Sequence, residues 1–137
     1  MYQFYFLSIV CNIFAAFALA PEQLEDKLPV VSDCMGRLLE RKGFSAGIGM
    51  AALVVGVFKL LSVTEGDVVV VGDLLPALAG ILGGGSLVFD YYKGKSTVEA
   101  PAAAFLESVL TKNRTLWGLT ALIAAVLHFF FPAVLFL

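Results

Sequence analysis

The segment GMAALVVGVFKLL at residues 49–61 is matched 69 positions later by GLTALIAAVLHFF at residues 118–130. Four aligned positions are identical, and the strongly polar residues of the two segments, Lys59 and His128, coincide. Self-similarity at a fixed spacing is the signature of a repeated structural unit. The chain is therefore predicted to contain an internal repeat.

The apolar segments that precede these two also align, at an offset of 68 positions. Small residues fall on small residues, with Ala15 and Ala16 on Gly83 and Gly84. Apolar segments often match by chance, but each one here is followed by a loop of similar length that contains proline and ends in two cations. We interpret residues 1–68 and 69–137 as two tandem transmembrane hairpins that together form one membrane domain.

The composition favours a bilayer over water as the surroundings of this chain. It is 60% hydrophobic and 15% charged, whereas soluble domains are about 45–50% apolar and about 25% charged. Helices of roughly 20 residues cross about 30 Å of hydrocarbon. Suitable segments are residues 4–20, 44–63, 74–92 and 115–132. We predict an all-α polytopic membrane protein with four transmembrane helices, whose two parallel hairpins are related by a pseudo-twofold axis along the membrane normal.

The cations are distributed very unevenly. Eight of the nine lie in two long loops: Lys27, Arg37, Arg41 and Lys42 in the first, and Lys93, Lys95, Lys112 and Arg114 in the second. The charged residues of the short loop between them are Glu65, Asp67 and Asp73. Basic loops stay in the cytoplasm. We therefore predict a multi-pass protein of the plasma (inner) membrane, with both long loops in the cytoplasm and both termini outside.

A cleaved signal peptide is the alternative for the first segment, because Ala18-Leu19-Ala20 is a small-x-small pattern after an apolar run. The segment lacks a basic start, and Pro21 follows the would-be cleavage point, so we expect it to be retained. Cys11 inside this segment and Cys34 in a cytoplasmic loop are expected to stay reduced.

Small residues indicate where helices approach closely in lipid. The predicted packing residues are Ala15 and Ala16 of the first span and Gly80, Gly83, Gly84 and Gly85 of the third. We expect these two spans to form the central pair, with the second and fourth facing lipid or another protomer. A hinge in the glycine run is the alternative.

Three polar residues inside the spans are candidates for a polar path or an anion site: Asn12, Lys59 and His128. Lys59 lies near the outer end of its span, where an ammonium can reach water or pair with an acidic residue of the outer loop. The alternative is an outer anion vestibule shared with His128 across the repeat axis. Asn12 is expected to form an interhelical hydrogen bond, with the lining of a solute path as the alternative.

Two features belong to the membrane surface. Amphipathic stretches at residues 35–42 and 106–113 are predicted to be helices that lie at the cytoplasmic interface. Aromatic residues at span ends are expected to act as interfacial anchors. These residues are Tyr2, Tyr5, Tyr91, Tyr92 and Trp117.

The sequence contains no recognisable motif for enzymatic chemistry. One His and two separated Cys cannot form a zinc site, no acidic pair occupies a span, and a pI near 5.2 gives no support for nucleic-acid binding. We predict a non-enzymatic protein without cofactor or metal, a structural or accessory subunit that packs with itself as a homo-oligomer or with other membrane subunits. A small homo-oligomeric channel or transporter is the alternative.

Overall fold

The structure is a computed structural model and describes residues 2–61, 74–96 and 101–131. Helices account for 89% of these residues, and none of them lies in a strand. The elements in chain order are α1 (Tyr2–Leu19), α2 (Pro21–Glu25), α3 (Pro29–Leu39), α4 (Lys42–Leu61), α5 (Leu74–Lys93), α6 (Pro101–Leu106), the π-helical turn η1 (Glu107–Thr111) and α7 (Arg114–Phe130). The predicted all-α class is confirmed.

Four long helices occupy the four predicted span positions. Of these, α4 and α5 have the length and hydropathy of a membrane span, each with 20 residues, whereas α1 and α7 belong to the shorter apolar helices. Residues 62–73, which were predicted to form the acidic outer loop, and the C-terminal residues 132–137 lie outside the described residues. Two helices could therefore span a membrane on length and hydropathy, and crossing by all four stays a prediction.

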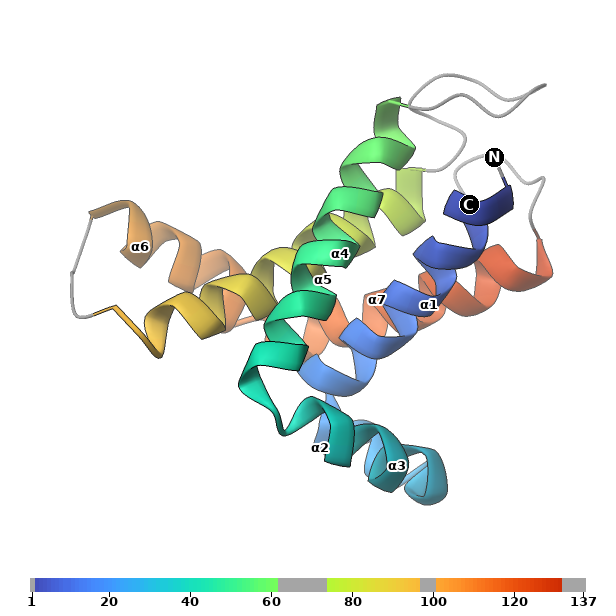
Figure 1. The fold of residues 1–137 in the computed structure, drawn as a ribbon, viewed down its shortest axis with the longest axis horizontal. Helices are drawn as coiled ribbons and strands as arrows, with labels where there is room; N and C mark the ends of the chain where they lie inside the picture. The colour runs from blue at the N-terminus through green and yellow to red at the C-terminus, as the bar shows by residue number, and fades with distance from the viewer. Residues whose placement is uncertain (1, 62–73, 97–100, 132–137) are drawn as a thin grey trace.

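The four long helices alternate in direction (Figure 1). Tyr5 near the start of α1 lies against His128 near the end of α7, and Arg114 at the start of α7 donates a hydrogen bond to Ala18 O. Thus α1 and α7 are antiparallel, and the same holds for α4 and α5. At one end of the bundle α1 and α5 end while α4 and α7 begin; this end is called the basic end below.

Prolines determine where the short helices begin. Pro21 and Pro29 stand in the first turns of α2 and α3, where the missing N–H costs no helical hydrogen bond. The predicted helix at residues 35–42 is thus partly wrong: α3 begins earlier and ends at Leu39, and α4 already begins at Lys42. The predicted helix at residues 106–113 is also shifted, because α6 begins at Pro101 and continues into η1.

The closest helix contact is between α4 and α5. The helices α1 and α5 each contact all three other long helices, which agrees with the expectation that the first and third spans form the central pair. A Cβ on Gly49 would lie 2.7 Å from Leu87 Cβ and 2.9 Å from Gly84 O, and one on Gly56 would lie 2.7 Å from Ala77 O. Backbones come this close only where side chains are missing. The glycines of α4 thus allow its backbone to approach that of α5 closely. The side of α4 that carries Gly49 and Gly56 is therefore buried in the bundle.

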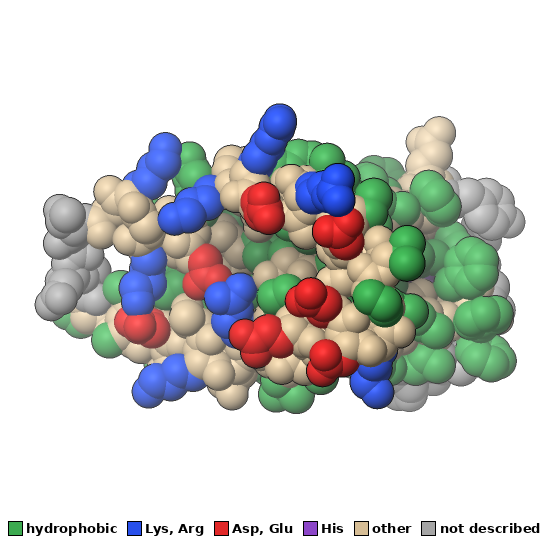
Figure 2. Space-filling view, turned by 90° about the horizontal axis from the view of Figure 1, so that it is seen from below, with side chains coloured by type: hydrophobic (Ala, Val, Ile, Leu, Met, Phe, Trp, Pro, Cys, Tyr) green, Lys and Arg blue, Asp and Glu red, His purple; other side chains and the backbone are tan. Residues whose placement is uncertain are grey.

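Charged side chains gather at the basic end. Of the described Asp, Glu, Lys and Arg residues, every one except Lys59 falls within residues 22–42 or 90–114. Figure 2 shows these charges clustered over one part of the surface and hydrophobic side chains covering the part beside it. The long helices therefore have an apolar middle and one strongly charged end.

Candidate functional site

A buried lysine–histidine pair lies at the end of the bundle opposite the basic end. Lys59 of α4 is 5% exposed and His128 of α7 is 1% exposed. Their Nζ and Nε2 atoms are 2.9 Å apart. The two residues that coincide in the sequence repeat are thus in direct contact. The acidic residues with which Lys59 was expected to pair, in residues 62–73, lie outside the described residues.

This contact determines the hydrogen-bond roles of both groups. An ammonium can only donate, so Nε2 of His128 accepts and the ring proton is on Nδ1 when Lys59 is charged. The pair therefore forms a buried hydrogen bond between α4 and α7.

Tyr5 of α1 completes the cluster. Its hydroxyl donates a hydrogen bond of 2.5 Å to the backbone oxygen of His128, and its ring lies 4.5 Å from the imidazole, centroid to centroid. Lys59 Nζ lies 5.5 Å from the centre of the same ring, within the range of a cation–π interaction. Tyr5 was expected only as an interfacial anchor. Its partners lie on helices distant in sequence, and no local pattern indicates them.

Asn12 lies on α1 seven residues beyond Tyr5, about 10 Å further along the helix axis. It is 1% exposed, and its Nδ2 donates a 3.1 Å hydrogen bond to Pro76 O of α5. Its Oδ1 has no hydrogen-bond partner among the described residues. Asn12 thus forms an interhelical hydrogen bond but is not part of the contact between Lys59 and His128.

The predicted packing residues divide among three different contacts. Gly80 and Gly84 face the α4 backbone, whereas a Cβ on Gly83 would lie 3.6 Å from Ala15 Cβ of α1. Ala15 packs with Leu19 and Leu87, and Ala16 packs in a cluster with residues of α7. Gly85 is not part of a close helix contact. The nearest atom to a Cβ at this position would be in the side chain of Leu110 of η1, at 3.9 Å.

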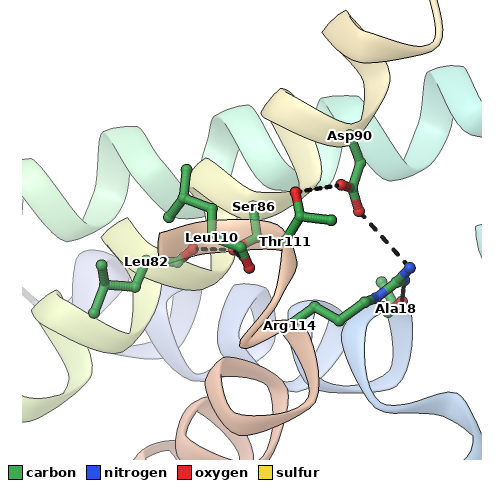
Figure 3. A network of polar contacts seen from close by, with 7 residues as sticks. All are labelled: Ala18, Leu82, Ser86, Asp90, Leu110, Thr111 and Arg114. Carbon is green, nitrogen blue, oxygen red and sulfur yellow. Dashed lines mark hydrogen bonds and ion pairs between the residues drawn. The ribbon is translucent and has the colours of Figure 1, made fainter. Parts of the chain in front are cut away.

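A second polar network joins α1, α5, η1 and α7 at the basic end (Figure 3). Asp90 accepts a 3.3 Å hydrogen bond from the Thr111 hydroxyl and lies 3.9 Å from Arg114, which also donates to Ala18 O at 3.2 Å. Ser86, fully buried, donates to Leu82 O at 2.8 Å and lies 3.4 Å from Leu110 O. Of these residues, Arg114 was predicted only as one of the loop cations, and no local pattern in the sequence indicates a contact with Asp90 or Thr111.

The parts of the chain that the structure describes hold no group of three His, Cys, Asp or Glu residues placed to bind a metal ion. Cys11 is buried in α1, Cys34 is exposed in α3, and both are free thiols.

The fold and these sites define an all-helical protein with two helices able to span a membrane and a buried polar cluster at one end of its bundle. The model of a protein family of unknown function matches residues 1–128, and the chain belongs to this family. Comparisons with curated proteins and with solved structures find no match.

Proposed function

We propose that this protein is a non-enzymatic, four-span membrane protein that serves as a structural or accessory subunit. The observation that carries the proposal is the separation of charge from the apolar middle of α1, α4, α5 and α7, where Lys59 is the one described exception. The 17 residues of α7 give a length of about 26 Å, at the lower limit for a span.

The large apolar side chains on the outside of the bundle support a location among lipids and other subunits. On α4 they recur at helical spacing, as Met50, Val54, Val57 and Leu61, each at least 40% exposed. On α7, Leu116, Ile123, Val126 and Phe130 form a similar stripe. Stripes of this size on a water-soluble monomer would be an aggregation hazard, whereas lipid tails or partner helices cover them without penalty.

The proposed orientation places the basic end in the cytoplasm. All described cations except Lys59 lie at this end, which is the arrangement that the positive-inside rule requires. The termini and residues 62–73 would then lie outside.

Gentle extraction from native membranes, followed by native electrophoresis and mass spectrometry of the band, tests the subunit role. We expect other membrane proteins to co-migrate in fixed stoichiometry, or a homo-oligomer that is inactive in flux assays. A monomeric band without any partner would contradict the proposal.

A second candidate is transport of a small anion, and the specific observation in its favour is the cluster of Tyr5, Lys59 and His128. Ionisable residues buried in a membrane are costly and usually functional. In chloride-loaded liposomes that contain the protein, this candidate predicts a chloride flux above that of chloride-loaded liposomes without protein. We expect Lys59→Met to lower this flux at least about tenfold.

Asn12→Leu tests whether Asn12 lines the solute path. Full chloride flux in that variant would show that Asn12 is not part of the path. Equal chloride flux in liposomes with and without the protein would contradict transport.

A further inference from the structure

A cavity of about 520 Å³ opens at the basic end, where all four long helices meet. Its volume is within the range of about 300–1,000 Å³ that is typical of small-ligand sites. The residues that matter for its chemistry are Lys42, Lys93, Lys95 and Arg114, together with Asp90 and Thr111. The cavity is distinct from the cluster of Tyr5, Lys59 and His128, which lies at the opposite end.

The charge of this cavity is strongly positive. Among the described residues, four cations line it and Asp90 is its one acidic group. Asp90 lies 3.9 Å from Arg114, and Lys93 is paired at 2.6 Å with Glu107, which is not part of the lining. Lys95 lies 4.8 Å from the centre of the Tyr91 ring, and within the described residues neither Lys95 nor Lys42 forms an ion pair. Two lysines are therefore left to attract an anion.

The helix ends add to this attraction. Lys42 and Arg114 are the first residues of α4 and α7, two long helices whose N-termini carry partial positive charge. The side-chain charges of Lys42 and Arg114 add to this partial charge. Ser45 adds a hydroxyl group that can donate to an oxyanion, whereas the Thr111 hydroxyl donates to Asp90.

The cavity also has an apolar side. Ala18, Leu39 and Leu87 line it together with the cations. In the orientation proposed above, the cavity lies at the depth of lipid headgroups on the cytoplasmic side. Basic pockets between membrane helices at this depth suit the phosphates of anionic lipids.

We propose that this cavity binds a phosphate group, carried either by an anionic phospholipid or by a small soluble phosphate ester. Lys42 and Lys95 provide the attraction, Arg114 remains oriented by Asp90 and Ala18 O, and the hydroxyl of Ser45 donates to a phosphate oxygen. The lipid source rests on the proposed membrane location, whereas the phosphate site itself does not.

The test is a titration of the full chain in neutral detergent with phosphatidylglycerol, followed by native mass spectrometry. Phosphatidylcholine serves as the lipid without net charge, and glycerol 1-phosphate as the soluble anion. The variant is Lys42→Gln with Lys95→Gln. Its matched control is Lys27→Gln with Lys112→Gln, which removes two exposed cations of the same loops outside the cavity.

We expect wild type and control to bind phosphatidylglycerol at least about tenfold more tightly than phosphatidylcholine, and the cavity variant to lose this preference. Displacement by glycerol 1-phosphate would support the phosphate group as the recognised moiety. Binding of glycerol 1-phosphate with no lipid preference would support a soluble ester as the source. Equal losses in variant and control, or no binding of either anion by wild type, would overturn the site.

Carbonate extraction of membranes from the same cells separates this inference from the proposed function. A cavity variant that stays in the membrane but binds no phosphate would agree with both the proposed membrane location and the proposed phosphate site. Wild type released by carbonate would contradict the membrane proposal without affecting the titration in detergent.

Discussion

The contact between Lys59 and His128 joins α4 to α7 through a buried hydrogen bond. Removing one partner of a buried hydrogen bond leaves the other group without that bond, at a cost of about 1–3 kcal/mol. Removing both partners together costs less than the sum, because neither partner of this bond is then left without the other. The pair is therefore suited to a double-mutant cycle.

For Lys59→Met, His128→Leu and the double variant we expect a coupling free energy of about 1–2 kcal/mol. Each protein is expected to remain folded, and the quantity measured is the free energy of unfolding in detergent. Lys112→Met, at an exposed position of the basic end, is the control and should change stability by less than about 0.5 kcal/mol. Additive losses would contradict a direct interaction between the two side chains.

The sequence allowed part of this site to be predicted. Lys59 and His128 occupy equivalent positions of the predicted repeat, and the predicted axis between the hairpins was the reason to expect them near each other. Tyr5 could not be predicted, because its two contacts depend on the rotation of α1 about its own axis. The same rotation directs Asn12 toward Pro76 and away from the pair.

At the level of elements, the glycines of α4 decide how the helices pack. Gly49 and Gly47 belong to the same helix, but a Cβ on Gly49 would collide with Leu87 and Gly84, whereas one on Gly47 would have no atom within 4 Å. The sequence shows both as glycines in an apolar run. Only the three-dimensional arrangement distinguishes the one that permits close approach from the one that faces outward.

We expect Gly49→Ala to lower the free energy of unfolding by about 2 kcal/mol, because overpacking a tight contact costs about 1–3 kcal/mol. Gly47→Ala is the control and should be neutral or stabilising, by up to about 1 kcal/mol, since alanine favours helix more than glycine does. The measurement is unfolding of each variant in mixed detergent micelles. A larger loss for Gly47→Ala than for Gly49→Ala would contradict the described packing of α4 on α5.

Gly118 tests whether the repeat extends to packing. It aligns with Gly49 in the sequence, and a Cβ there would lie 2.9 Å from Leu19 Cβ, just as Gly49 faces Leu87. We expect Gly118→Ala to destabilise the protein about as much as Gly49→Ala. Tolerance of Gly118→Ala together with sensitivity at Gly49 would show that the two hairpins pack by different rules.

At the scale of the whole molecule, hydropathy located the long helices well. The described ends of α4 and α5 lie within two residues of the predicted spans. The short elements were predicted less well, because the π-helical turn η1 and the exact ends of α3 depend on contacts with the long helices. Two topologies remain to be distinguished. In one, only α4 and α5 cross the membrane; in the other, which is the one proposed, all four long helices cross it.

These two topologies differ in where the termini lie. If α4 and α5 alone crossed the bilayer, the N-terminus, residue 34 and the C-terminus would all be on one side. If α1 and α7 also cross, both termini lie opposite residue 34. Cys34 is exposed and Cys11 is buried, so the native chain already carries one reactive reference point.

The most direct measurement is therefore a side-specific labelling experiment in intact cells and inverted vesicles, on the chain with an epitope tag at each end. We predict that a membrane-impermeant maleimide reaches Cys34 only in inverted vesicles, whereas antibodies reach both tags only in intact cells. Tags and Cys34 accessible from the same side would contradict the four-span account.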